Sequence, residues 1–216
     1  MPFNPLVPVA PDDPAKGLIR QANEALILAA AERVFAGAGF GGATMAAIAD
    51  EAGRPKANLH YYFGSKQELY RAVLAQTLKD WLEPTRVISP DADPKTAIEA
   101  YIRAKMTLSA QRPHASRVFA NELLHGAAVV KTLLATDLRD MVLSKAQVIA
   151  HWVATGQMAA VDPVHLFFTI WAATQTYADF EVQVCAVLGC NTLTPADQTR
   201  ATEHVVALIL RGCGLK

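Results

Sequence analysis

Residues 54–66 read RPKANLHYYFGSK, and the interpretation of the whole chain starts from this stretch. Three consecutive aromatic residues, Tyr61, Tyr62 and Phe63, lie between basic residues, and the stretch contains no carboxylate. A helix turns by about 100° per residue, so three adjacent rings cannot all face one core. We therefore expect at least one ring to face outward beside the lysines, where a partner can reach it.

The stretch lies within a predicted series of a long helix, two very short helices and a longer helix. Thr44 can cap the second helix, Gly53 ends it, and Pro55 can open the third without offering a side-chain cap. Two short helices joined by a glycine turn match the helix-turn-helix pattern. The expected ranges are 14–38, 44–51, 55–62 and from 65 until Pro84.

The rest of the chain also shows a helical pattern. Asp-Pro and Thr-Pro pairs mark the starts of helical segments, and glycines mark their ends. The expected ranges are 94–112, 114–125, 127–155, 163–188 and 195–212. We therefore predict an all-α fold of about nine helices. A flexible N-terminal arm (1–14) precedes a three-helix helix-turn-helix DNA-binding domain (15–64), and a larger ligand-binding and dimerisation domain (65–216) follows.

Composition limits the possible functions. Among 216 residues, 20 Lys and Arg balance 20 Asp and Glu, which excludes a globally basic nucleic-acid coat but permits a local basic patch. The three cysteines are sparse and odd in number, which favours a reducing compartment over a disulfide framework. Neither a signal peptide nor a membrane span is recognised at the N-terminus. We expect a cytoplasmic protein that needs no metal, cofactor or membrane.

Residues 27–74, ILAAAERVFAGAGFGGATMAAIADEAGRPKANLHYYFGSKQELYRAVL, carry a specific resemblance. The run F-x-x-x-G-F-x-x-A-T, the core I-A-x-x-A-G and the end Y-Y-F-x-S-K-x-E-L-Y resemble the DNA-binding domain of TetR-family transcriptional regulators. Downstream, KDWLEP, ASRVFANELLHGA and VDPVHLFFTIWAATQTYADF are similar to the pyrimidine-utilisation (Rut-type) repressors of that family. The resemblance implies a ligand-responsive repressor that binds a palindromic double-stranded DNA operator as a homodimer.

The third helix is the expected recognition helix, whose N-terminal residues lie near base edges in the major groove. Asn58 can pair with adenine, Lys56 can donate to guanine or phosphate, and Ala57 permits close approach. The family pattern usually has a small apolar residue and a serine-like cap where Arg54 and Pro55 stand. The expected DNA contacts are Thr44, Arg54, Lys56, Ala57, Asn58, His60, Tyr61, Tyr62 and Lys66.

Polar groups inside apolar helices indicate a site for a small-molecule effector, because burying them costs free energy unless they are hydrogen-bonded. The resemblance implies a planar heterocycle, such as a pyrimidine, held by the Gln175 amide and stacked on an aromatic ring. The residues alone leave an alternative open, in which the two tryptophans belong to the core and Arg117 pairs with Glu122 on the surface. The expected lining is Trp81, Arg117, Glu122, Trp171, Thr174, Gln175 and Tyr177.

The last two predicted helices are the expected dimer interface. The segment 164–188 is apolar on more than one face, and Val205, Leu208, Ile209 and Gly212 recur at helical spacing. Two such helices from each subunit would form a four-helix bundle. Two alternatives stay open from the residues alone: a small helical enzyme, although the six histidines show no metalloprotease spacing, and a helical module that binds protein instead of DNA.

Overall fold

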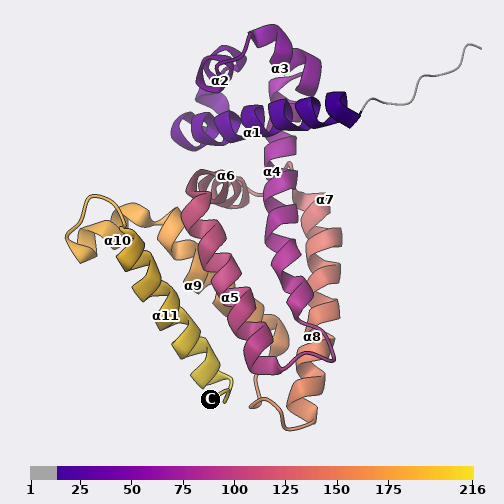
Figure 1. Ribbon diagram of the computed structural model, residues 1–216, viewed down its shortest axis with the longest axis vertical. Coiled ribbons are helices and arrows are strands. Elements are labelled where there is room, and N and C mark those ends of the chain that lie inside the picture. Colours follow the sequence, from indigo (N-terminus) through magenta and orange to yellow (C-terminus); the bar gives the residue numbers. More distant parts are fainter. Residues whose placement is uncertain (1–13) are drawn as a thin grey trace, which may run out of the picture.

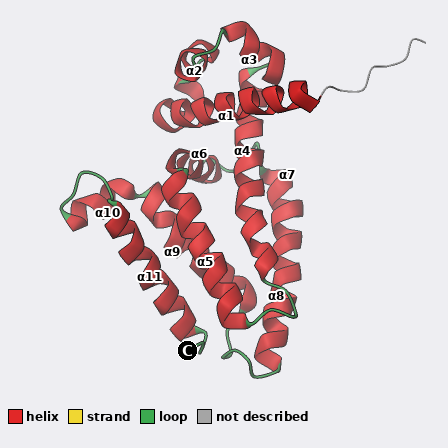
Figure 2. Cartoon of the chain, in the orientation of Figure 1, coloured by secondary structure: helices red, strands yellow, loops and turns green. Residues whose placement is uncertain are grey.

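The computed structural model describes residues 14–216, and its regular structure is entirely helical (Figure 2). The predicted arm lies outside the described residues, apart from the proline that begins α1 (Pro14–Gly42). In Figure 1, α1 lies across one end of the molecule, with α2 (Met45–Ala52) and α3 (Lys56–Phe63) beyond it. Helix α4 (Lys66–Leu82) leads from this head into the body.

The body is a group of helices that pack on one another, and α4 runs down into it from the head (Figure 1). A 3₁₀ turn (Glu83–Val87) follows α4, and a π turn (Leu134–Leu138) precedes α8. The helices of the body are α5 (Pro94–Gln111), α6 (Pro113–Leu124), α7 (Lys131–Leu133), α8 (Arg139–Ala154), α9 (Pro163–Asp179), α10 (Glu181–Leu188) and α11 (Pro195–Gly212). The prediction of an all-α fold is confirmed.

The head is built around the apolar stripe of α1. Ile27, Ala31 and Phe35 are buried at helical spacing and pack with Ile48 of α2 and Leu59 of α3. The same cluster continues along α4 and into α6 and the turn that follows it. The head is therefore joined to the body by a continuous apolar core.

Local chemistry sets the ends of the short helices as predicted. The Thr44 hydroxyl accepts the backbone N–H of Ala47 at 3.1 Å, which caps α2. Gly53 ends α2 with a φ of 59°, in the left-handed region that glycine adopts without strain. Gly39 has a φ of 68° and interrupts α1, as expected, although one more helical turn follows it.

Two long predicted helices each correspond to two α-helices, so residues 14–216 contain eleven α-helices in place of about nine. The segment 163–188 is broken after α9 because Arg117 Nε donates to the carbonyl of Ala178 at 3.0 Å, a carbonyl that a continuous helix would use itself. The segment 127–155 begins late because the Glu122 carboxylate accepts the N–H of Val129 at 2.6 Å and holds a turn there.

Side chains also join head and body. The Tyr70 hydroxyl of α4 donates to Glu122 of α6 at 3.1 Å, and the Tyr70 ring packs on Phe35 of α1 at 5.0 Å between centroids. Arg112, between α5 and α6, forms ion pairs with Glu32 of α1 and Asp80 of α4. These contacts fix α4 between the head and the body.

The 17–42 part of α1 has the length and hydropathy of a membrane span. Its apolar character has a different explanation here, because Ile27, Ala30 and Ala31 are fully buried in the head. The expectation of a flexible, non-spanning N-terminal arm concerns residues before this helix.

The buried Glu122 carboxylate generates a prediction about stability. Glu122→Ala leaves the Tyr70 hydroxyl and the Val129 N–H without their partner, and each unsatisfied buried group costs about 1–3 kcal/mol. We expect the free energy of unfolding, measured by urea denaturation, to fall by about 2–4 kcal/mol.

Glu83→Ala is the matched control, because Glu83 is an exposed glutamate paired with Arg86 on the surface. Its loss should change the free energy of unfolding by less than about 1 kcal/mol. Equal stability of the two variants at the same protein concentration would contradict the structural role of Glu122.

Candidate nucleic-acid interface and effector cavity

Helix α3 presents one exposed strip to solvent. Lys56, Ala57, His60 and Tyr61 are exposed, and their i, i+1, i+4, i+5 spacing places them on one side of the helix. Leu59 is buried on the opposite side. Tyr61 is 74% exposed and meets the ring of its neighbour edge-on, so the aromatic expected to face outward is this residue.

The other predicted contacts of α3 are more restricted. Asn58 is half-buried, and its backbone N–H donates to the carbonyl of Pro55 at 2.9 Å in the first turn. His60 Nδ1 lies 2.7 Å from the carbonyl of Gly64, which ties this ring to the end of its own helix. The exposed strip that remains most open therefore consists of Lys56, Ala57 and Tyr61.

Lys66 has a structural function that sequence reasoning missed. Its ammonium donates to the carbonyls of Phe40 at 2.7 Å and Ala43 at 2.9 Å, and it lies 4.4 Å from the centre of the Phe40 ring. It therefore holds the end of α1 against the start of α4. An ammonium has three N–H donors, so one is left for a phosphate. Thr44 is exposed, and because only its hydroxyl oxygen is used to cap α2, its hydroxyl hydrogen can also donate to a phosphate.

Two predicted contacts are bound to α1 through a residue that sequence reasoning also missed. Arg54 Nε donates to Asn23 Oδ1 at 3.2 Å, and Asn23 Nδ2 donates to the Tyr62 hydroxyl at 3.3 Å. Arg54 also donates to the carbonyl of Gly53 at 3.2 Å. Nothing in the spacing of Asn23 distinguishes it within α1, because its partners lie more than 30 residues away.

A cavity of about 90 Å³ lies between α4, α5, α6, α8 and α9. Three predicted ligand contacts line it: Trp81 from α4, and Trp171 and Gln175 from successive turns of α9. Tyr101 and Lys105 of α5 line it as well. The i, i+4 spacing of the two α9 residues explains why they share one side of that helix.

The cavity combines apolar walls with a few polar groups. Lys105 Nζ lies 4.3 Å from the centre of the Trp81 ring, and burial lowers the pKa of this amine to about 7 while Asp179 acts in the opposite direction. Trp171 Nε1 donates to the Tyr101 hydroxyl at 2.8 Å, and burial raises the pKa of that phenol. The site therefore offers a flat ring, an amine that titrates near neutrality and the amide of Gln175.

The four other predicted ligand contacts do not line this cavity. Arg117 pairs with Glu181 at 2.6 Å, and Glu122 is occupied by α4 and the turn after α6. The Thr174 hydroxyl donates to the carbonyl of Ile170 in its own helix at 2.8 Å. Tyr177 lines a separate groove between α10 and α11. Arg117, Glu122 and Thr174 are therefore each satisfied by partners within the fold.

Sequence reasoning missed Lys105 although a signal was available. The lysine follows Ile98 and Tyr101 at the spacing of one helical face, and all three are buried. A charged residue in phase with an apolar stripe is rarely buried without a partner or a function. Applied to α5, this rule would have identified the amine as part of the interior.

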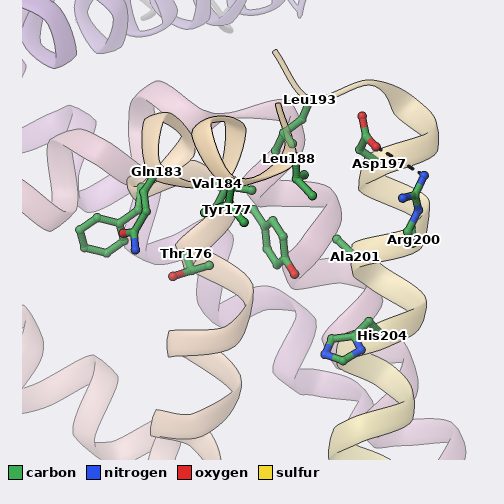
Figure 3. A pocket seen from close by; sticks show the side chains of 12 residues that line it. Thr176, Tyr177, Gln183, Val184, Leu188, Leu193, Asp197, Arg200, Ala201 and His204 are labelled. Carbon is green, nitrogen blue, oxygen red and sulfur yellow. Dashed lines mark ion pairs between the residues drawn. The ribbon is translucent and has the colours of Figure 1, made fainter. Parts of the chain in front are cut away.

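The groove between α10 and α11 is open and apolar, with a volume of about 450 Å³ (Figure 3). Tyr177, Val184 and Leu188 face it from one side, and His204 faces it from α11. Val187 of α10 also lines the groove and is 82% exposed, while Val182, on another side of the same helix, is 87% exposed. Helix α10 therefore exposes apolar side chains both in the groove and outside it.

The expected apolar face of the last helix is divided. Val205 and Ile209 are buried in the core of the body, whereas Leu208 is exposed. The reason is geometric, because Leu208 lies about 100° from Ile209 around the helix. Val205 and Ile209 therefore belong to the core of the body, and the assignment of the last two predicted helices to a dimer interface stays a prediction.

Family models match the chain along most of its length. The model described as bacterial regulatory proteins of the tetR family matches residues 27–73, and the model for the C-terminal region of YcdC-like proteins matches residues 74–216. Two relatives named HTH-type transcriptional regulator RutR, from Escherichia coli O157:H7 and K12, are each 43% identical over 191 residues. That alignment covers 88% of this chain and 90% of each relative.

Solved structures share the fold at lower identity. A regulatory protein of the tetR family from Rhodococcus RHA1 aligns with a TM-score of 0.70 and 21% identity, over 90% of this chain and 98% of that one. AibR in complex with isovaleryl coenzyme A and operator DNA aligns with a TM-score of 0.62 and 18% identity, over 86% of this chain and 97% of that one.

The sequence matches establish what kind of protein this is. The relatives are transcriptional regulators with a helix-turn-helix, so the alternatives of a small helical enzyme and of a module that does not bind DNA are rejected. The resemblance expected from residues 27–74 is confirmed by the match to residues 27–73. The chain belongs to the TetR family of transcriptional regulators.

Proposed function

We propose that this regulator is a repressor that binds a palindromic operator as a homodimer in the cytoplasm and responds to a small planar heterocycle of the pyrimidine class. The observation that carries the DNA-binding part is the exposed strip of Lys56, Ala57 and Tyr61 on α3. This strip contains no carboxylate, and its lysine is the first residue of α3, at the positive end of the helix dipole. A helix of this kind can read base edges in a major groove.

The exposed apolar surface of α10 supports the homodimer. Val184, Val187 and Leu188 of α10 line the open groove together with Tyr177, and Val187 lies almost fully in solvent. Exposed apolar groups gathered in this way are typical of a protein interface. A two-fold axis through this surface would present two copies of α3 to two half-sites of an operator. The division of the chain at residues 64 and 65 remains part of this proposal.

The cavity supports a small effector. Its volume of about 90 Å³ is well below the roughly 300–1,000 Å³ of sites for drug-sized ligands. The Trp81 ring can stack on a flat molecule, while the Gln175 amide both donates and accepts hydrogen bonds. Lys105 can donate to a ring carbonyl or to a deprotonated ring nitrogen. The similarity to pyrimidine-utilisation repressors is consistent with this chemistry.

Helix α4 offers a route from the cavity to the head. Trp81 lines the cavity, and its neighbour Asp80 pairs with Arg112, which also pairs with Glu32 of α1. A ligand that displaces Trp81 therefore also changes how α4 is fixed to α1. A ligand shifts DNA affinity only through its different affinity for the two arrangements, and couplings of about 1–3 kcal/mol change affinity about 5- to 150-fold.

Lys56→Ala tests the DNA-reading strip. Duplexes preferred by the unmodified protein are first selected from genomic fragments, and affinity is then measured by gel shift. We expect Lys56→Ala to weaken binding to the selected duplex by about 5- to 150-fold, because a base contact contributes about 1–3 kcal/mol. If the Lys56 amine contacts a phosphate instead, the slope of log affinity against log salt concentration becomes shallower by about 0.9.

Lys95→Ala is the control, because Lys95 is an exposed lysine on α5 in the body. It should bind the selected duplex like the unmodified protein. Equal affinities of Lys56→Ala and Lys95→Ala would contradict the assignment of α3 as the recognition helix.

Gln175→Leu tests the effector cavity. We expect this variant to bind the selected duplex normally and to lose the binding of uracil, measured by calorimetry, because the apolar side chain cannot pair with the ring edge. Gln183→Leu is the matched control, since Gln183 lines the groove beside α10. Uracil binding that survives Gln175→Leu but not Gln183→Leu would assign the effector to the groove.

Arg112→Met tests the route along α4. The substitution removes both ion pairs of the junction and leaves the cavity lining intact. We expect effector binding to persist and the effector-dependent change in DNA affinity to fall below about 5-fold. Arg103→Met removes two ion pairs within the body and should leave the response unchanged. A full response in Arg112→Met would exclude this junction from the mechanism.

A further inference from the structure

We infer that Asn23 of α1 is a positioning residue for the recognition helix α3, an inference that rests on the proposed DNA interface. Its side chain bonds to both ends of the α3 region and so fixes the exposed strip relative to α1. Asn23 does not belong to the exposed strip of α3, and it is not one of the expected DNA contacts.

Helix α3 needs an external restraint. It has eight residues, and isolated helices of that length are unstable in water. Pro55 stands at its N-cap position and has no side-chain acceptor for the free N–H groups of the first turn. Leu59 anchors the helix to the core of the head, and the partly buried rings of Tyr62 and Phe63 pack against the same core. The rotation of α3 about its axis therefore depends on how these rings are held.

Asn23 supplies that restraint with two hydrogen bonds. Its Oδ1 accepts from Arg54 Nε at 3.2 Å, two residues before α3 begins. Its Nδ2 donates to the Tyr62 hydroxyl at 3.3 Å, in the last turn of α3. One half-buried side chain of α1 thus connects the approach to the helix with its far end, and 31 and 39 residues of chain separate it from these partners.

The neighbouring turn of α1 reinforces this contact. Arg20 lies with its guanidinium carbon 5.9 Å from the centre of the Tyr62 ring, within the range of a cation–π interaction. Glu24 holds that guanidinium at 2.9 Å. The ring of Tyr62 is therefore restrained at its hydroxyl by Asn23 and at its face by Arg20.

The restraint reaches the exposed strip through ring packing. Tyr61 meets Tyr62 edge-on, with 5.1 Å between ring centres. Holding Tyr62 therefore limits where the exposed ring of Tyr61 can lie, and holding Arg54 keeps its charge at the start of α3. Pre-organising a binding surface raises affinity by reducing the ordering cost at binding. The two bonds of Asn23 lie near the surface, where water can replace them in a variant, so their main effect is on binding.

Asn23→Leu tests this inference by removing both bonds at nearly constant side-chain size. We expect about a 10-fold loss of affinity for the selected duplex and a much smaller loss on random-sequence DNA. Asn23→Asp is the conservative rescue, because a carboxylate accepts from Arg54 and from the Tyr62 hydroxyl. It should restore most of the ratio of selected to random affinity. Asn191→Leu, at an exposed asparagine before α11, is the control and should leave the ratio unchanged.

Tyr62→Phe provides a second test that preserves the ring. Tyr62→Phe removes one of the two bonds, so it should lower the same ratio by less than Asn23→Leu does. In the double variant, the fold-loss should be smaller than the product of the two single-variant losses. If Asn23→Leu does not fold, the ratio for Tyr62→Phe decides the matter. An unchanged ratio in the folded variants would overturn the inference. If the unmodified protein prefers no sequence, the proposed function fails instead.

Discussion

Helix α4 carries the hydrophobic core of the head down into the body, and this one helix sets where the head lies. Leu69 and Val73 are fully buried in the core of the head, whereas Trp81, two turns later, lines the cavity in the body. A helix is stiff over this length, so its two ends move together. A displacement of Trp81 would therefore also move the residues of α4 that pack in the core of the head.

The junction around α4 is held by charged and polar contacts as well as by apolar packing. Arg112 pairs with carboxylates of both α1 and α4, and Tyr70 donates to the buried Glu122. Partly buried polar contacts need well-defined geometry, because a group that loses its partner costs free energy. Such a junction favours discrete arrangements over a continuous range, which is what a regulator that responds to a ligand requires.

Local chemistry made the helix ends predictable, and tertiary packing made the side-chain partners unpredictable. Thr44 and Ser65 cap the helices that their sequence positions indicated, because a cap involves residues three positions apart. Lys66 was expected at a phosphate but bonds to carbonyls at the end of α1, more than 20 residues away. Trp81 and Gln175, which family resemblance indicated, both line the cavity. Arg117, which was also expected there, forms an ion pair with Glu181.

In the proposed complex, two copies of α3 read one operator through the major groove. Methylation protection of guanine N7 on the selected duplex reports on this contact, because that atom lies in the major groove. We predict two protected clusters, related by the pseudo-two-fold symmetry of the duplex and separated by about one helical turn, or a multiple of it. If the protein binds the duplex with full affinity and all major-groove guanines stay reactive, α3 does not read the operator in this way.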